Sequence, residues 1–165
     1  MNWWPPSAGA PWQSADPSQP ETRQMVDEQP ACAVTVDEVQ DYLAGNGMQL
    51  DAFTVQSVET DRALVRWSYD DTKTRPGGAI SGPTIMQLVD LASWVAVFTR
   101  AGIVPMAVTW DLKTNFLRPA LGGDLLAEAT VLRFGRFTYL TVDVVVADDP
   151  AVVVSHATVT YAVPR

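Results

Sequence analysis

The chain has 165 residues, 47% of them hydrophobic, which is enough for one domain with a single core. Nineteen acidic residues outnumber eleven basic ones, giving a formal net charge of -8. This balance argues against nucleic acid or an anionic membrane as a partner, because both attract clustered Lys and Arg. The single cysteine, Cys32, excludes an intrachain disulfide and a multi-cysteine metal site. No signal peptide and no membrane-spanning run is recognisable, so we expect a cytoplasmic protein.

The first 33 residues are predicted to form an arm outside the folded domain. Residues 1–30 hold six of the twelve prolines and three of the six tryptophans. Proline at this density prevents regular backbone hydrogen bonding. We therefore expect a disordered or loosely docked arm over 1–33 and one domain over 34–165. An alternative is that the three tryptophans bind to the domain or to a partner.

The domain is predicted to begin with a short helix and a β-hairpin. The helix starts at Thr35, a possible N-cap with Glu38 three residues later, and stops at Gly45. Two segments rich in β-branched and aromatic residues follow, 49–59 and 62–69. The tight turn between them predicts an antiparallel hairpin.

A long helix is predicted from Gly82, the expected N-cap, to Arg100, with proline at its first position. Its few polar side chains recur every three residues and form one narrow stripe: Gln87, Asp90 and Ser93. A helix that is apolar almost all round is buried.

The last third of the chain is predicted to consist of three or four antiparallel strands, from the alternation in 107–117, 124–134, 137–148 and 152–163. In the first of these the alternation places Trp110 on one face with Leu112, Thr114 and Phe116. One long helix can cover only one face of such a sheet. The fold class is therefore α+β, a sheet layer packed on a helix layer.

Asp90 stands in the middle of the apolar helix, so its side chain is expected to be partly removed from water. Burying a carboxylate is costly unless donors surround it. One interpretation is structural, with Gln87, Ser93 or a backbone amide satisfying the acid. The other is that the carboxylate carries out chemistry.

The loop before this helix favours chemistry. Residues 75–83 are rich in glycine, including Gly78, and end at a helix N-terminus, where free N–H groups can stabilise a developing oxyanion. Gly82 and Asp90 are separated by ~12 Å of helical rise, too far for both to touch one carbonyl. If both act together, the acid comes from a second subunit. The spacing then predicts a homodimer with two interfacial sites.

The stretch 75–94, followed by AVTWDLKTNFLRPALGGDLLAEATVLRFGRFTY, resembles the PaaI-type acyl-CoA thioesterases of the hotdog fold. The resemblance covers about residues 36–164. It implies an antiparallel sheet wrapped around one long helix, and a homodimer often assembled into a homotetramer. It also implies hydrolysis of a short-chain, medium-chain or aromatic acyl-CoA. Thioester hydrolysis requires no metal and no organic cofactor.

The resemblance implies a role for several residues. The Gly82 amide would polarise the thioester carbonyl, Asp90 of the other protomer would act as general base or nucleophile, and Thr109 would help to place the water. Two positions depart from the usual pattern: the family histidine is Ser81, and an asparagine of some relatives is Arg75.

Substrate-binding candidates follow from the chemistry of coenzyme A, whose phosphates need cations at the mouth of the site. We expect these from Arg75, Arg133 and Arg136, and less strongly from Lys113 and Arg118. Four large side chains can shape the acyl pocket: Trp94, Phe98, Phe116 and Phe137. The bulk of Trp94 indicates a short or flat acyl group.

Three other functions are alternatives to the thioesterase. A non-catalytic acyl-CoA or fatty-acid binding protein is the main alternative, because the family histidine is absent. A hydratase of the same fold would need a neighbouring Asp and His, whereas the only histidine, His156, lies on the predicted last strand. A purely structural oligomer would leave the glycine loop and Asp90 without a purpose.

Overall fold

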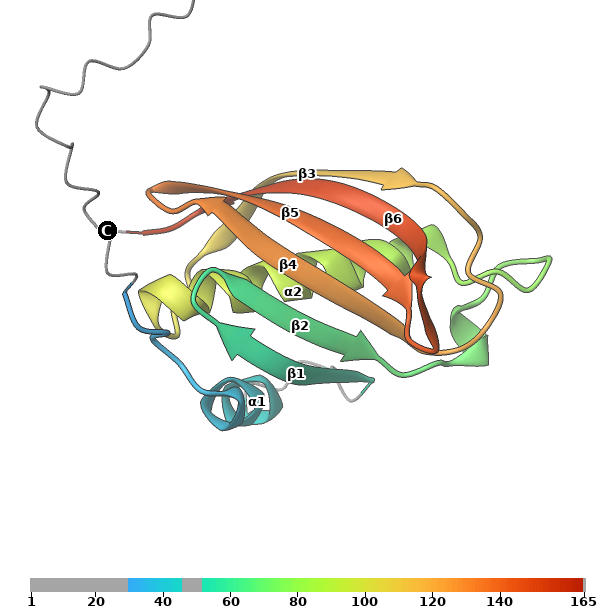
Figure 1. The fold of residues 1–165 in the computed structure, drawn as a ribbon, viewed down its shortest axis with the longest axis horizontal. Helices are drawn as coiled ribbons and strands as arrows, with labels where there is room; N and C mark the ends of the chain where they lie inside the picture. Colours follow the sequence, from blue (N-terminus) through green and yellow to red (C-terminus); the bar gives the residue numbers. More distant parts are fainter. Residues whose placement is uncertain (1–29, 46–51, 165) are drawn as a thin grey trace, which may run out of the picture.

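The computed structural model describes residues 30–45 and 52–164. In this part of the chain one six-stranded antiparallel sheet, in the order β1-β2-β4-β5-β6-β3, curves around one long helix (Figure 1). The prediction for residues 1–29 lies outside the described residues. The elements in chain order are α1 (Val36–Gly45), β1 (Phe53–Glu59), β2 (Arg62–Trp67), a short 3-10 helix (Asp71–Lys73), α2 (Gly82–Ala101), β3 (Val108–Phe116), β4 (Leu125–Arg133), β5 (Phe137–Val146) and β6 (Asp149–Ala162).

Helix α1 begins at the predicted capping box. The backbone N–H of Thr35 donates to Glu38 Oε2 over 2.8 Å, and the N–H of Glu38 donates back to Thr35 Oγ1 over 3.3 Å. These bonds satisfy two donors that a helix start would otherwise leave free. The helix buries Val39 and Leu43 and packs beside β1 (Figure 1).

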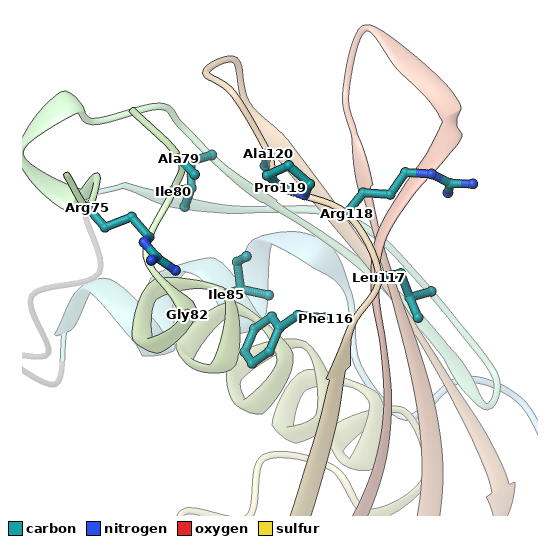
Figure 2. A pocket seen from close by; sticks show the side chains of 10 residues that line it. All are labelled: Arg75, Ala79, Ile80, Gly82, Ile85, Phe116, Leu117, Arg118, Pro119 and Ala120. Carbon is teal, nitrogen blue, oxygen red and sulfur yellow. The ribbon is translucent and has the colours of Figure 1, made fainter. Parts of the chain in front are cut away.

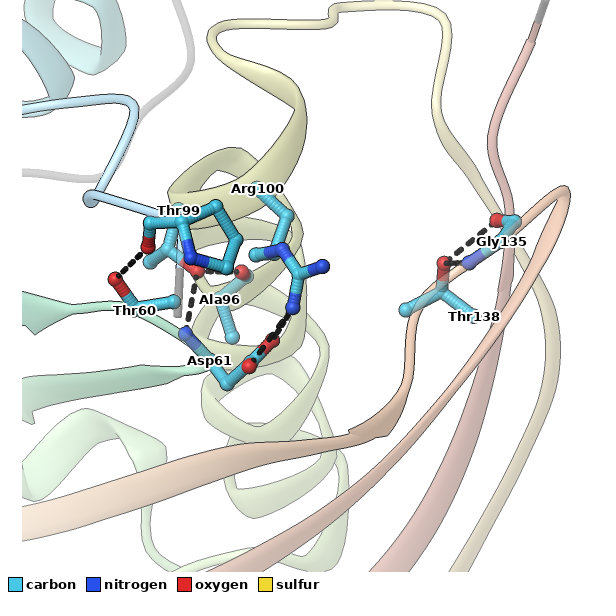
Figure 3. Close-up of polar contacts among 8 residues, drawn as sticks. Thr60, Asp61, Ala96, Thr99, Arg100, Gly135 and Thr138 are labelled. Atoms are coloured by element: carbon cyan, nitrogen blue, oxygen red, sulfur yellow. Dashed lines mark hydrogen bonds and ion pairs between the residues drawn. The ribbon is translucent and has the colours of Figure 1, made fainter. Parts of the chain in front are cut away.

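The β1–β2 turn is tied to the C-terminal end of α2 (Figure 3). Asp61 adopts a positive φ of 66°, and its carboxylate accepts from Arg100 Nη1, 2.9 Å from each oxygen. The Asp61 N–H donates to Thr99 Oγ1 over 3.1 Å, and Thr60 Oγ1 donates to the carbonyl of Pro30 over 2.8 Å. This network fixes the predicted hairpin against the helix.

The turn between β4 and β5 is closed by one side chain (Figure 3). Thr138 Oγ1 donates to the carbonyl of Gly135 over 2.8 Å and accepts from its N–H over 3.2 Å. On β5 the predicted alternation is confirmed, because Leu140, Val142 and Val144 are buried. The sheet face formed by these residues packs on α2.

Helix α2 is capped by Ser81, and the prediction that Gly82 is the N-cap is wrong by one residue. Ser81 is extended, with φ -70° and ψ 145°, and its Oγ accepts from the N–H of Thr84 over 3.4 Å. A glycine has no side chain that could accept this bond, so the serine takes the position. Most of the helix is buried, as predicted. Within the described residues no helix is long and apolar enough to cross a membrane.

Strand β3 forms one edge of the sheet and contains a β-bulge between Thr109 and Asp111. The extra residue moves Trp110 to the opposite face from Leu112 and Thr114, so the predicted alternation is wrong at this position. Trp110 is 69% exposed, and its ring lies 5.3 Å from that of Phe137 between centroids. The bulge also turns the side chain of Thr109 toward the helix.

Candidate active site

Asp90 lies in the middle of α2, where two hydroxyl groups from the sheet reach its carboxylate. Thr109 Oγ1, at the start of β3, donates to Asp90 Oδ1 over 2.6 Å. The hydroxyl of Tyr161, near the end of β6, lies 2.7 Å from the same Oδ1 and 3.0 Å from the backbone carbonyl of Asp90. Asp90 is thus held by hydroxyls from two neighbouring strands.

Strand register brings these two hydroxyls together. Thr109 and Tyr161 are directly paired across β3 and β6, so both side chains point to the same face of the sheet. Tyr161 is only 3% exposed. Burial, followed by the charge of Asp90, raises the pKa of Tyr161 well above its usual range. The phenol therefore stays protonated and acts as a hydrogen-bond donor.

Both hydroxyls use the same oxygen, which leaves Oδ2 of Asp90 without a hydrogen bond from any described residue. The expected structural partners are not used: Ser93 Oγ donates to the carbonyl of Val89 over 2.8 Å. Asp90 instead lines a pocket of about 460 Å³, together with Gln87, Leu91, Trp94, Ala107, Val108, Thr109 and Tyr161. A carboxylate with one oxygen held and one free, in a largely apolar pocket, can accept a proton or attack a carbonyl.

A second pocket, of about 350 Å³, lies at the start of α2 (Figure 2) and is called the Gly82 pocket below, as the first is called the Asp90 pocket. The N–H of Gly82 is in the first helical turn and has no acceptor among the described residues. A Cβ atom on residue 82 would come within 3.3 Å of Phe116 Cζ, so glycine allows the ring to lie against the helix start. The pocket is lined by Arg75, Ala79, Ile80, Gly82, Ile85, Phe116, Leu117, Arg118, Pro119 and Ala120. A free backbone donor at a helix N-terminus can stabilise an oxyanion.

The two arginines of this pocket differ in direction. Arg75 extends toward the start of α2, whereas Arg118 extends away from it (Figure 2). Arg118 Nη1 also donates to the carbonyl of Val153 over 3.2 Å. Arg75 is therefore the better placed of the two for an anion at the Gly82 end of the helix.

The glycine-rich loop is a small turn in front of the helix. Thr74 and Ile80 form an isolated β-bridge, and Gly77 and Gly78 both have positive φ, 100° and 80°. The N–H of Gly78 already donates to the carbonyl of Arg75 over 3.0 Å. This glycine shapes the loop, and the free donor at its end is that of Gly82.

The other predicted site residues are spread over the molecule. Trp94 lines the Asp90 pocket and packs on Phe98, with 4.9 Å between ring centroids. Arg136 lies at the β4–β5 turn in a separate pocket, 5.8 Å from the ring centroid of Phe137. Neither Arg136 nor Arg133 lines the Asp90 pocket or the Gly82 pocket.

Tyr161 was not among the predicted site residues. Its place on the last strand is visible in the alternation, but its contact with Asp90 depends on the register between β3 and β6. The bulge in β3 sets the register that pairs Thr109 with Tyr161. A bulge inserts one extra residue into a strand, and the alternation of apolar residues in the sequence does not reveal it.

The Asp90 pocket and the Gly82 pocket have no residue in common. Within one chain, the acid and the free backbone donor thus belong to separate sites along α2. This agrees with the separation of ~12 Å between Gly82 and Asp90 that the helical rise predicts. One chain alone does not bring the two groups to the same carbonyl.

Comparisons with known proteins show which family and which folds this chain resembles. Residues 77–155 match the family model of the thioesterase superfamily. A protein named "Putative esterase SSO2140" in Saccharolobus solfataricus is 36% identical over 90 residues, which cover 54% of this chain and 63% of that protein. The chain thus spans less than two thirds of this relative's length, and it spans 53% of a second relative from the same organism.

Solved structures show the same fold over almost their full length. Zebra fish thioesterase superfamily member 2 superposes with a TM-score of 0.70 at 24% identity, covering 79% of this chain and 99% of that one. The PaaI protein of Escherichia coli superposes with a TM-score of 0.68 at 18% identity, covering 79% and 94%. The described domain therefore has the hotdog fold, and its residues 77–155 match the thioesterase superfamily.

Proposed function

We propose that this protein is an acyl-CoA thioesterase, which hydrolyses a short-chain, medium-chain or aromatic acyl-CoA to the free acid and coenzyme A. The observation that carries this proposal is the state of Asp90. Its Oδ1 is held by two hydroxyls, while its Oδ2 has no partner among the described residues and the side chain lines a pocket. Such a carboxylate suits a general base or a nucleophile.

We propose further that the working unit is a homodimer paired along β3, which then assembles into tetramers in some cases. β3 is an edge strand with exposed apolar side chains, among them Val108 and Phe116, each 52% exposed. An edge of this kind favours pairing with another strand. Two-fold pairing would place the start of one β3 beside the end of the other.

This pairing would complete the site. The start of β3 carries Thr109, next to Asp90, and its end carries Phe116, next to Gly82. An antiparallel β3–β3 contact would therefore bring the Asp90 pocket of one protomer beside the Gly82 pocket of the other. Each dimer would contain two complete sites, as the helical spacing predicts.

The reaction follows from the two groups. The Gly82 N–H donates to the thioester carbonyl oxygen and stabilises its negative charge as the carbonyl carbon becomes tetrahedral. Oδ2 of Asp90 from the partner subunit accepts a proton from water, and the water oxygen bonds to that carbon. The carbon–sulfur bond then breaks, and the proton passes from Asp90 to the departing thiolate. In the nucleophilic variant, Oδ2 itself bonds to the carbonyl carbon, and the carbon–sulfur bond breaks to give an anhydride and a thiolate. Water later hydrolyses the anhydride and supplies the proton that the thiolate takes up. Neither route requires a metal or an organic cofactor.

Substrate binding is assigned to both pockets. Trp94, in the Asp90 pocket, would limit the acyl group to a short or flat one. Arg75, beside Gly82, would bind a phosphate of coenzyme A, and Arg133 and Arg136 would do so only if the nucleotide extends to the β4–β5 turn. Acyl-CoA esters are water-soluble substrates, and we place the enzyme in the cytoplasm.

One observation favours the alternative, a non-catalytic acyl-CoA or fatty-acid binding protein. The residue at the family histidine position, Ser81, is engaged in capping α2 and also contacts Thr84 Oγ1 at 2.8 Å. It is therefore not free to orient a thioester as a histidine would be. A binding protein, however, has no use for the free oxygen of Asp90.

The test is release of free thiol from acetyl-, hexanoyl-, lauroyl-, phenylacetyl- and benzoyl-CoA, with wild type assayed beside Asp90→Asn. Hydrolysis of at least one ester by wild type, reduced ~10²-fold or more in the variant, supports the thioesterase. Binding of the esters without turnover supports the binding protein. If wild type neither cleaves nor binds any ester, both proposals are wrong.

The shared site has its own test, mixing of two inactive variants. Asp90→Asn lacks the acid, and Gly82→Pro lacks the backbone donor. Random exchange of subunits gives mixed dimers with one intact site, so activity should return to roughly a quarter of the wild-type value. No recovery, in a mixture shown to exchange subunits, contradicts a site built from two protomers.

A further inference from the structure

Tyr161 is the most deeply buried polar residue that lines the Asp90 pocket, and its hydroxyl lies 2.7 Å from the carboxylate. A phenylalanine would fill the same space in the core. A buried hydroxyl costs stability unless it finds a hydrogen-bond partner. Here the shorter of its two contacts, 2.7 Å against 3.0 Å to the backbone carbonyl of the same residue, is to the carboxylate of the one acid in α2, so the hydroxyl serves the acid as well as the packing.

The position of the contact matters as much as its existence. The torsion that rotates an aspartate carboxylate has broad, roughly two-fold minima, so the two oxygens of a free side chain exchange readily. Thr109 and Tyr161 approach Oδ1 from adjacent strands, at 2.6 Å and 2.7 Å. Short hydrogen bonds to an ionised oxygen are the strong ones. Rotation of the carboxylate would break both of them at once.

We propose that Tyr161 is a positioning residue of this site: with Thr109 it fixes Oδ1 of Asp90, so that Oδ2 is the oxygen that reacts. This rests on the proposed thioesterase function and adds a residue to its machinery. Tyr161 touches neither substrate nor water in this role and acts only through Asp90. The same fixation serves the general-base and the nucleophilic route, because both use Oδ2.

The surroundings of the contact leave few other groups to hold Asp90. Of the described residues that line this pocket, Asp90 is the only acid and none is a base. Because the phenol remains protonated, it donates to the carboxylate throughout the pH range of an assay. Its removal should leave Oδ1 of Asp90 held by Thr109 alone.

The experiment compares Tyr161→Phe with wild type on whichever acyl-CoA wild type hydrolyses. Loss of a hydrogen bond to a charged group corresponds to a fall of about 10- to 100-fold, which we expect in kcat and not in KM. Tyr139→Phe is the matched control: this tyrosine lies on β5 and is 44% exposed, and we expect its kcat and KM to stay as in wild type.

Two further variants separate positioning from folding. Thr109→Val removes the other donor to Oδ1 at an exposed residue, and its kcat should fall while its KM stays near the wild-type value. In an Asp90→Asn background, Tyr161→Phe should add no further loss, because the hydroxyl acts through that acid. A thermal melt of each variant shows whether the fold is kept.

The outcomes are distinct. If Tyr161→Phe and Thr109→Val keep the wild-type kcat, the positioning role is wrong and the thioesterase proposal stands. An equal further loss in the Asp90→Asn background also contradicts the role. If wild type hydrolyses no ester of the panel, the proposed function fails and the positioning role fails with it.

Discussion

Asp90 is part of α2 and Asp61 contacts the C-terminal end of α2, but their carboxylates are held in opposite ways. Both oxygens of Asp61 lie 2.9 Å from Arg100 Nη1, and the two side chains are only about a quarter exposed, 24% and 26%. Asp90 receives two neutral hydroxyls, both on Oδ1, and no cation. Asp61 has both oxygens bonded to a cation, whereas Asp90 has one oxygen bonded to neutral groups and one without a partner among the described residues.

The difference separates a structural acid from a reactive one. An ion pair that engages both carboxylate oxygens stabilises the fold but leaves no oxygen without a partner to accept a proton. A carboxylate bonded on one side retains a basic oxygen in a defined direction. Substituting Asp90 should therefore lower the activity and leave the stability nearly unchanged, whereas substituting Asp61 should lower the stability and leave the activity unchanged.

The largest effect is expected for Asp90→Asn. The amide preserves the size of the side chain and can still accept from Thr109 and Tyr161, but it cannot take a proton from water. We expect kcat for thioester hydrolysis to fall by about 10²- to 10⁴-fold. The free energy of unfolding should change by less than about 1 kcal/mol, as measured by urea denaturation. Full activity in this variant would show that Asp90 is a structural residue after all.

The backbone donor of Gly82 can be tested with two substitutions that add the same Cβ atom near Phe116. Gly82→Ala keeps the N–H, whereas Gly82→Pro removes it, and the extended Ser81 before it is compatible with a following proline. We expect kcat of the proline variant to be about 10²-fold below that of the alanine variant, as for loss of one oxyanion donor. Equal rates in the two variants would mean that this N–H does not contact the carbonyl.

The structural acid is tested by Asp61→Asn. Asparagine tolerates the positive φ of this position, so the substitution removes the charge without adding backbone strain. We expect a loss of about 1–2 kcal/mol in the free energy of unfolding, between the values for exposed and for buried ion pairs. The kcat should stay unchanged. Glu128→Gln, in the more exposed pair with Arg62, is the control and should cost less stability.

Much of the fold could be predicted because it depends on local patterns. The capping box of α1 and the apolar length of α2 each follow from a few neighbouring residues. The alternation of β5 and the α+β layers likewise follow from short-range periodicity. Asp90 could be singled out for the same reason, as one acid in an apolar run.

What could not be predicted depends on register between strands. The bulge in β3 sends Trp110 to the outer face and turns Thr109 toward Asp90, and a pattern of period two cannot show a single extra residue. Tyr161 is 71 residues from Asp90, and only the β3–β6 pairing makes them neighbours. The N-cap was displaced by one residue because Ser81 and Gly82 both suit that position.

The smallest effect concerns a third acid, Asp124, which resembles Asp61 in using both oxygens. The N–H of Tyr69 donates to Oδ1 and Arg66 Nε to Oδ2, each over 2.8 Å. The Tyr69 N–H first, and then Arg66, hold the pKa of Asp124 below its usual value.

A carboxyl group whose pKa is lower in the folded state stabilises the fold above its unfolded pKa and loses that contribution as the pH falls through its folded pKa. The free energy of unfolding should therefore decrease below about pH 4, and Asp124→Asn should make this decrease shallower. Because the side chain is 29% exposed, we expect a difference of less than about 1 kcal/mol between pH 6 and pH 2.5. Urea denaturation of wild type and Asp124→Asn at a series of pH values measures this difference. If the free energy of unfolding falls equally with pH in the two proteins, the hydrogen bonds to Asp124 stabilise the fold no more than hydrogen bonds to water would.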